Sequence, residues 1–238
     1  MCVVTLLEIC LDDVAGAAIA EQHGADRIEL CADLAQGGTT PSIGTVAAVL
    51  ASISRVGIQV LIRQRPGDFV PSRLEVDAMV GDIEWIRGLA RPEGVRVGFV
   101  IGALTADGTI DVPVLRRLLR ACGPAPVTFH RAFDAVADQR ESLETLIDLG
   151  LHRVLTSGGA VSAAAGIHRL TALVEQADDR IGVLAAGGIR AHTVAELVAR
   201  TGVPEVHLRA QPSAPTTSSP PATSAEIVRA VARALSRG

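Results

Sequence analysis

The sequence predicts a (β/α)8 TIM-like barrel, formed as a single domain by residues 1–238. The length suits one large α/β domain with a sizeable core. Short β-branched runs alternate with stretches of helical period along the whole chain, which is typical of βα units around a parallel sheet. There are eight such runs, the number a barrel requires. A doubly wound open sheet is the alternative, but the first strand is followed by Cys10-Leu11-Asp12-Asp13 and not by a glycine-rich dinucleotide turn.

The predicted strands span residues 5–10, 27–31, 58–63, 95–101, 127–130, 153–156, 181–185 and 205–208. Helices fill the intervals, most clearly at 72–89 and 138–149. Ser72 and Glu75 form a capping-box pattern at the start of the first of these helices. Its apolar face follows helical spacing through Val76, Met79, Val80 and Ile83. Residues 211–223 are rich in Pro, Ser and Thr and predict a surface loop before the last helix, for which no role is expected.

The composition excludes several functions. The chain contains no lysine, so a Schiff-base aldolase, a pyridoxal-phosphate anchor and a P-loop lysine are ruled out. We therefore expect neither pyridoxal phosphate nor a nucleotide as cofactor. The net charge of −4 argues against nucleic acid or a membrane surface as a partner.

The amino-terminal residues and the cysteines predict a cytoplasmic protein with reduced thiols. Glu8, Asp12 and Asp13 stand where a signal peptide would be apolar. The uncharged stretch 34–54 contains two adjacent glycines and a proline, so it is not expected to span a membrane. Four cysteines without a C-x-x-C pair do not form the pattern of a secreted disulfide scaffold.

Strand alternation predicts which side chains point into the barrel. Taking the apolar positions as helix-facing leaves a charged inward set toward the carboxyl-terminal mouth: Glu8, Glu29, Arg63, Arg65, His130, His207 and Arg209. Barrel enzymes place their sites at this mouth. Glu8, Glu29 and His130 are the candidate acid–base residues. The alternative is a structural ion-pair network that closes the top of the barrel.

An anion site is a second hypothesis for the same mouth. Arg63, Arg65 or Arg131 would clamp the anion, and His207 would also contact it. The turn Gly187-Gly188 could offer backbone N–H groups, assisted by Ser157 or Arg209. Glycines after strands are also ordinary tight turns, so both interpretations remain open.

Two Glu-x-Cys triplets end consecutive strands and predict a pair of neighbouring thiols. Glu8-Ile9-Cys10 and Glu29-Leu30-Cys31 both place the cysteine inward. Neighbouring strands lie about 4.8 Å apart, so the two thiols could hold a soft, two-coordinate ion. The alternative is that Cys10 and Cys31 serve as small hydrophobic residues of the core.

Several motifs, taken in order, make the chain resemble a known family. They are LEIC (7–10), GADRIELC (24–31), GGTTPS (37–42), IRQRPGDF (62–69), LTADG (104–108), VTFHRAFD (127–134), RVLTSG (153–158) and VHL (206–208). Together they resemble the CutC family, which is named for copper homeostasis. The family's third-strand motif usually reads Arg-Pro-Arg-Gly-Gly-Asp-Phe, whereas this chain has Gln64 and Pro66. Proline at 66 removes a backbone donor, which puts anion contacts by that loop in doubt.

The resemblance implies a cytoplasmic barrel that forms a homo-oligomer and binds Cu(I) through Cys10 and Cys31. Two functions are therefore expected as alternatives. One is a copper-homeostasis protein with Cu(I) at the thiolates. The other is an isomerase-, lyase- or hydrolase-like enzyme acting on a small anionic or phosphorylated molecule. A purely structural oligomer accounts least well for the charged mouth.

Overall fold

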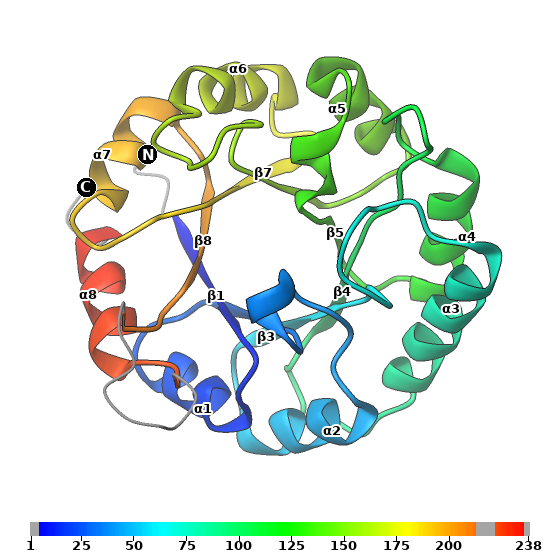
Figure 1. The fold of residues 1–238 in the computed structure, drawn as a ribbon. Helices are drawn as coiled ribbons and strands as arrows, with labels where there is room; N and C mark the ends of the chain where they lie inside the picture. Colours follow the sequence, from blue (N-terminus) through cyan, green and yellow to red (C-terminus); the bar gives the residue numbers. More distant parts are fainter. Residues whose placement is uncertain (1–4, 213–221, 236–238) are drawn as a thin grey trace.

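The computed structural model describes residues 5–212 and 222–235 and shows a closed barrel of eight parallel strands inside a ring of helices (Figure 1). The strands are β1 (Leu6–Leu11), β2 (Arg27–Leu30), β3 (Gly57–Leu61), β4 (Val97–Ile101), β5 (Val127–Phe129), β6 (Arg153–Thr156), β7 (Gly182–Ala186) and β8 (Glu205–Arg209). The helices are α1 (Val14–Gln22), α2 (Ile43–Ser52), α3 (Arg73–Arg87), α4 (Val112–Cys122), α5 (Gln139–Asp148), α6 (Ile167–Ala177), α7 (Val194–Thr201) and α8 (Ala225–Leu235). Two short 3₁₀ helices follow β2 and β5, at Leu34–Gln36 and Arg131–Ala135.

The order of the strands confirms the predicted barrel and excludes the open sheet. Each strand pairs with its neighbour in sequence, and β1 pairs in parallel with β8 to close the ring. This closure removes the exposed sheet edges that an open sheet would leave. All the strands consequently point their carboxyl ends toward the same mouth.

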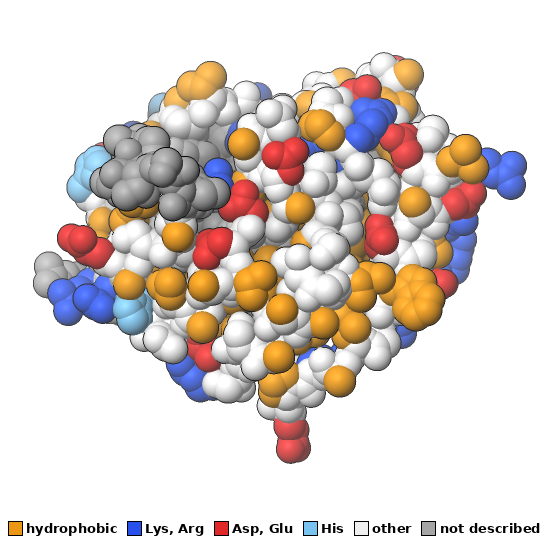
Figure 2. All heavy atoms as spheres, turned by 60° about the horizontal axis from the view of Figure 1, so that its bottom comes forward, with side chains coloured by type: hydrophobic (Ala, Val, Ile, Leu, Met, Phe, Trp, Pro, Cys, Tyr) orange, Lys and Arg blue, Asp and Glu red, His pale blue; other side chains and the backbone are white. Residues whose placement is uncertain are grey.

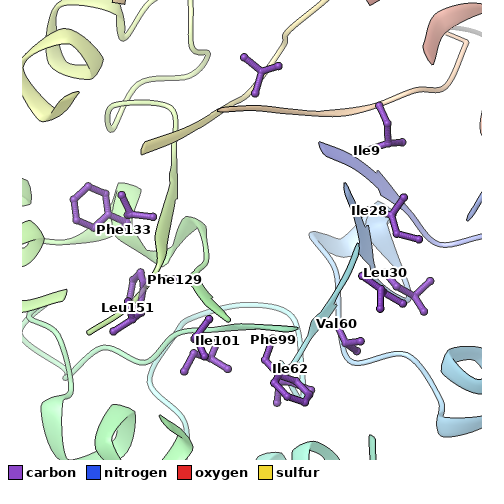
Figure 3. Packing of buried hydrophobic residues seen from close by; sticks show 14 of the residues in the cluster. Ile9, Ile28, Leu30, Val60, Ile62, Phe99, Ile101, Phe129, Phe133 and Leu151 are labelled. Carbon is purple, nitrogen blue, oxygen red and sulfur yellow. The ribbon is translucent and has the colours of Figure 1, made fainter. Parts of the chain in front are cut away.

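The main hydrophobic core lies between the strands and the helices. Ile9, Ile28, Val60, Phe99 and Phe129 are fully buried and belong to one continuous cluster (Figure 3). All five occupy helix-facing positions, as strand alternation predicted for each of them except Phe99. Burying a side chain of this size contributes roughly 1.5–3 kcal/mol, so this layer dominates the stability of the barrel.

The inside of the barrel is much more polar. Its buried polar side chains come from five strands: Glu8, Arg27, Glu29, Gln59, Thr128, Glu205 and His207. Two small apolar clusters share this space, one built on Cys31, Leu61 and Val100 and the other on Leu155 and Leu184. A buried charge is costly unless it is paired, so the ion pairs inside the barrel decide how these groups are held.

The two helices that were clearest in the sequence begin at their predicted caps. Ser72 caps α3, and the reciprocal bond from the Ser72 backbone N–H to Glu75 completes the capping box. Asp138 caps α5 through the backbone N–H groups of Arg140 and Glu141. Helix α3 buries Val76, Met79, Ile83 and Ile86 against the barrel.

Three strands end earlier than the sequence indicated, and β2 does so by one residue, at Leu30. Strand β3 ends at Leu61 and β5 at Phe129, so Arg63 and His130 lie on the loops that follow. Most of the predicted loop at 211–223 falls outside the described residues. Its far end is tied back to the barrel, because Thr223 Oγ1 donates to Asp13 Oδ2 at 2.7 Å.

Figure 2 brings the α1 and α2 side of the barrel forward. Acidic and basic side chains of the described residues lie interspersed with hydrophobic ones over this face. Among the described helices, none combines the length and apolar character needed to cross a membrane.

Candidate functional site

A cavity of about 600 Å³ opens at the carboxyl-terminal mouth. Eight of the predicted site residues line it together: Cys10, Glu29, Cys31, Arg63, His130, Arg131, His207 and Arg209. Parallel strands end on the same side, so β1, β2 and β8 and the segments that directly follow β2, β3 and β5 bring these residues to one mouth. The predicted grouping of residues at the mouth is therefore present, although their chemical roles are not tested by position alone.

The two cysteines lie next to each other at the floor of this cavity. The register of β1 and β2 places Cys10 opposite Glu29, and Cys31 follows two residues later. The sulfur atoms of both cysteines and a carboxylate oxygen of Glu29 all lie within 4.8 Å of one another. All three residues are buried. The chain thus brings two thiols and a carboxyl group close enough to share one ion.

His207 connects this cluster to a second carboxylate. Its Nδ1 lies 2.7 Å from Glu8 Oε1, and its Nε2 lies 3.6 Å from Glu29 Oε2. Oxygen and nitrogen atoms of these three residues also lie within 4.8 Å of one another. The imidazole therefore sits between the carboxylate of Glu8 and the cysteine cluster.

In this cluster a negatively charged group lies next to a positively charged one. The hydrogen bond from Cys31 lowers the pKa of the Cys10 thiol to about 5, against the effect of burial and with help from His207. Burial alone would lower the pKa of His207, but the Cys10 thiolate, Glu8 and Glu29 raise it well above its usual range. Cys10 is accordingly a thiolate at neutral pH, and it faces a positively charged imidazolium.

The other two members of the cluster stay neutral. Burial raises the pKa of Glu29 to about 8 even though His207 opposes it. The hydrogen bond to Cys10, together with burial, raises the pKa of the Cys31 thiol well above its usual range. At neutral pH the cluster therefore keeps one proton on Cys31 and one on Glu29.

A column of ion pairs runs from the cluster toward the other end of the barrel. Arg27 Nε donates to Glu8, and Arg27 Nη2 donates to Glu205. Burial opposes ionisation of Glu8, but Arg27 and His207 outweigh it and lower its pKa to about 2. Arg153 Nε adds a bond of 3.1 Å to Glu205. Glu8 lies below the cavity and does not line it, so the structure gives this residue a position beside His207 and not beside a bound molecule.

His130 is buried at the opposite wall of the cavity. Its ring lies 5.1 Å from that of Phe69, and its Nδ1 accepts the backbone N–H of Ala132 at 3.2 Å. Burial, with a smaller contribution from Arg63, lowers the pKa of His130 to about 3. The imidazole is therefore neutral at physiological pH, a state that suits a proton acceptor or a ligand.

Two arginines of the mouth are fixed by hydrogen bonds, and each still has an N–H group without an acceptor among the described residues. Arg63 donates to the carbonyl groups of Gly37, Gly38 and Gly67, and its Nε is buried without a partner among the described residues. Arg209 Nη2 donates to Asp12 Oδ1 at 2.9 Å, and its Nε is likewise buried and unpartnered. A buried N–H without an acceptor costs about 1–3 kcal/mol, so both positions favour a bound acceptor.

Arg65 departs from the predicted inward set. Its side chain is 41% exposed and lies outside the 600 Å³ cavity. Its Nε donates to Glu75 at 2.6 Å and its Nη2 to Asp68 at 2.8 Å. Because β3 ends at Leu61, strand alternation no longer governs residue 65, and the two carboxylates hold the guanidinium at the rim.

Ser157, which was predicted to assist an anion site, already binds a carboxylate of the chain. Asp134 accepts the backbone N–H groups of Ser157 and Gly159 and the hydroxyl of Thr156. Arg131 Nε donates to the same carboxylate at 2.8 Å. These donors are the ones an external anion would need, so the turn after β6 is closed to it.

Gly187 and Gly188 lie after β7, away from the cavity lining. Both have positive φ, and a Cβ on Gly187 would lie 3.3 Å from the Cβ of Ser157. The glycines thus allow the turns after β6 and β7 to approach each other closely. Anion binding by their N–H groups remains a prediction.

Comparison with known proteins identifies the family of this chain. Residues 5–212 match the sequence profile of the CutC family. The chain belongs to the CutC family. It is 46% identical over 206 residues to the human protein named copper homeostasis protein cutC homolog, covering 87% of this chain and 73% of the human one. A CutC family protein of Caulobacter vibrioides is 47% identical over 202 residues, covering 85% of this chain and 80% of that protein.

Solved structures agree with this assignment. The crystal structure of the CutC protein from Streptococcus agalactiae superimposes with a TM-score of 0.78 at 33% identity, covering 85% of this chain and 97% of that one. N-(5'-phosphoribosyl)anthranilate isomerase from Pyrococcus furiosus gives a TM-score of 0.61 at 14% identity, with 98% and 100% coverage. The second likeness shows the barrel fold alone.

The loop after β3 in this CutC chain presents carbonyl groups to its arginines. Gly67 O accepts Arg63 Nη2 at 2.8 Å, and Pro66 O accepts Arg65 Nη1 at 3.3 Å. That Pro66 weakens the loop as a backbone anion site stays a prediction. The loop positions Arg63 instead.

Sequence reasoning missed three residues that hold the CutC site in place. Arg27 and Glu205 lie two residues before Glu29 and His207, so the same alternation that placed those residues inward could have found them. Asp134 lies in the 3₁₀ helix after β5, where no periodic pattern applies. Only its three-dimensional contacts show that it fills the turn after β6.

Proposed function

We propose that this CutC chain binds Cu(I) as cargo between Cys10 and Cys31 and contributes to copper homeostasis. The observation that carries the proposal is the shared position of two buried sulfur atoms and one carboxylate oxygen, all within 4.8 Å. A two-coordinate Cu(I) ion lies on the line between its two sulfur ligands. With the zinc–thiolate bond length of about 2.3 Å as a guide, the two sulfur atoms need to lie about 4.6 Å apart. The family membership and the name of the human relative support the same function.

The donor set suits a soft cation. Thiolates favour Cu(I) over hard cations. The group of ligand atoms that lie within 4.8 Å of one another contains two cysteine sulfur atoms and one carboxylate oxygen. Binding needs both sulfur atoms deprotonated. Since Cys10 is already a thiolate, Cu(I) would displace only the proton on Cys31 and leave the net charge of the buried cluster unchanged.

An anaerobic Cu(I) titration against a competing chelator tests this proposal. We expect one equivalent bound tightly by the wild type and lost in Cys10→Ser/Cys31→Ser. The matched control is Cys2→Ser/Cys122→Ser, which removes the other two cysteines and should keep the affinity. Binding that is indifferent to Cys10 and Cys31 would overturn the proposal, provided circular dichroism shows that the double variant is folded.

The unpartnered arginine donors favour a second candidate function, an enzyme acting on a small anionic molecule. Arg63, Arg209 and His130 line one cavity of about 600 Å³, a size suited to a small ligand. The equivalent of inorganic phosphate that binds at the mouth, measured by calorimetry, should be lost in Arg63→Gln and kept in Arg65→Gln, whose guanidinium is held by Glu75 and Asp68. Equal losses in both variants would count against this candidate.

Two further expectations follow from the proposal. A Cu(I) site built on free thiols needs a reducing compartment, so we propose a cytoplasmic location. We also propose self-association, supported by the exposure of Leu74 and Trp85 on α3, at 78% and 71%. Light scattering of the wild type and of Trp85→Arg tests the second point, with a lower mass expected for the variant.

A further inference from the structure

We propose a second binding site at the end of the barrel opposite the mouth, for a small polyanion that carries phosphate groups. A cavity of about 1,020 Å³ lies there. The first residues of β1, β2, β3, β4 and β6 line it, and so do the carboxyl-terminal ends of α3 and α4. It is therefore separate from the cysteine cluster, and the inference does not depend on copper binding.

The lining of this lower cavity is strongly basic. Its acidic residues are Asp26 and Glu84, and its basic residues are Arg27, Arg55, Arg87, Arg91, Arg96, His152 and Arg153. The whole chain has a net charge of −4, so this concentration of arginine does not follow from overall composition. A concave surface lined by one sign of charge focuses the field on its contents.

Most of these arginines have no carboxylate partner. Arg27 and Arg153 pair with Glu205 inside the barrel. In contrast, no ion pair within the described residues involves the four remaining arginines, which are Arg55, Arg87, Arg91 and Arg96. Asp26 lines the same cavity, but its carboxylate accepts the backbone N–H of Leu7 at 2.8 Å. The basic excess is thus not neutralised by the chain itself.

Some of the guanidinium groups are already fixed in position. Arg87 Nη1 donates to Ala121 O at 2.6 Å, and Arg55 Nη2 donates to Glu21 O at 3.2 Å. Both bonds use carbonyl groups and leave the positive charges uncompensated. Arg153 Nη1 is buried without a hydrogen-bond partner among the described residues. Fixed donors lose less conformational entropy when a ligand binds.

The arrangement selects a chemical class of ligand. Guanidinium groups match the oxygen atoms of phosphate in a bidentate geometry. Four unpaired arginines suit more than one phosphate group. Among the described residues of the lining, the one aromatic ring is that of His152, which accepts the backbone N–H of Val127, and no Phe or Trp is there to stack on a base; this favours a compact phosphorylated molecule over a nucleotide.

Stability alone does not account for this cluster. The amino-terminal end of such barrels ordinarily serves stability. Like charges gathered on one concave surface repel one another, and a bound polyanion would offset that repulsion. Binding of an anionic ligand therefore explains this arginine cluster better than a role in stabilising the barrel does.

Calorimetric titration of the full-length protein with inorganic tripolyphosphate at low salt tests the site. We expect Arg91→Gln/Arg96→Gln to weaken binding at least about tenfold, because two charge-assisted contacts are lost. The matched control is Arg229→Gln/Arg233→Gln, which removes two charges from α8 on the other side of the helix ring and should change affinity less than about twofold. Thermal unfolding of both variants checks that they are folded.

The mouth also contains arginines, so a third variant assigns the binding to one end. Arg63→Gln alters the mouth and should leave tripolyphosphate binding at the lower cavity intact. Binding lost in Arg63→Gln and kept in Arg91→Gln/Arg96→Gln would overturn the proposal, as would no binding by the wild type. Equal weakening by the α8 control pair would indicate a non-specific charge effect and would overturn it too. Citrate binding as tightly as tripolyphosphate would overturn the phosphate preference.

Discussion

Glu8 Oε1 lies 2.7 Å from His207 Nδ1, with both side chains buried inside the barrel. This contact turns the other ring nitrogen of His207 toward Glu29, 3.6 Å away. The orientation keeps a positive charge next to the Cys10 thiolate. Glu8 thereby acts on the cysteine cluster through His207, as a positioning residue beneath the cavity.

Replacing Glu8 by glutamine should strongly destabilise the protein. Glu8→Gln leaves Arg27 with one carboxylate partner and His207 without its bond to an anion. Removing one member of a buried ion pair typically costs about 3–5 kcal/mol. Urea unfolding at pH 7 measures this loss, with Glu226→Gln on the exposed side of α8 as the control. A loss below about 1 kcal/mol would show that the column of ion pairs is not a major source of stability.

The thiols should differ in reactivity in a defined order. In a Cys2→Ser background, iodoacetamide at pH 6.5 is expected to modify Cys10 first. Cys10 lines the mouth cavity, and its pKa is lowered to about 5 by the hydrogen bond from Cys31. Burial raises the pKa of Cys122 to about 12, so that thiol stays protonated. Peptide mass spectrometry over time identifies the modified residue.

The same experiment contains its own check. The rate at Cys10 should change little between pH 6.5 and pH 8.5, because the thiolate is already formed at the lower value. Modification of Cys122 ahead of Cys10, or a rate at Cys10 that rises about tenfold per pH unit, would contradict the proposed thiolate–imidazolium pair.

The titration of His130 should make a contribution to folding stability that is lost in mild acid. Its pKa is lowered from 6.5 in the unfolded chain to about 3 in the folded protein, chiefly by burial. Below pH 6.5 the unfolded chain therefore binds a proton that the folded protein does not. Stability from this group is complete above pH 6.5 and decreases as the pH falls toward 3, by up to about 1.4 kcal/mol per unit.

His130→Asn removes this titration and keeps an acceptor for the Ala132 N–H. We expect the difference in unfolding free energy between pH 7.5 and pH 5 to shrink by roughly 2 kcal/mol in this variant. His168→Asn on the exposed surface of α6 is the control and should leave the pH dependence unchanged. A pH dependence that is the same in all three proteins would contradict the assignment to His130.

The barrel could be predicted because its signals are periodic. Alternation placed Glu29, Cys31 and His207 inside, and the structure brings these side chains together at one mouth. The same rule failed at Arg65, which lies beyond the end of β3, where carboxylates near in space replace the strand as the determinant of orientation. Position along a strand is a local property, so sequence can supply it.

Charge compensation is not local, and sequence alone could not supply it. Glu205 meets Arg27 across 178 positions of the chain, and the choice of that partner depends on closure of the barrel between β1 and β8. The lower arginine cavity illustrates the same limit, because Arg55, Arg91 and Arg153 come from three separate parts of the sequence. Such a grouping becomes visible only when the strands are assembled.

Removing Asp134 should open an anion site at the turn after β6, where Ser157 was predicted to assist anion binding by Gly187 and Gly188. In Asp134→Ala the backbone N–H groups of Ser157 and Gly159 lose their carboxylate, and Arg131 loses an ion pair. We expect a loss of a few kcal/mol in stability, since Ser157 and Thr156 are buried and their donors are left without this acceptor. Sulfate should then restore part of that loss by occupying the vacated position.

Thermal unfolding with and without about 50 mM sulfate, at constant ionic strength, measures this rescue. The control is Asp138→Ala, which also removes a carboxylate that accepts two backbone N–H groups, those of Arg140 and Glu141, but at the exposed start of α5. Sulfate should stabilise Asp134→Ala more than it stabilises the control or the wild type. Equal stabilisation of all three proteins would mean that the turn is a structural closure which Asp134 completes, and that its donors do not form an anion site.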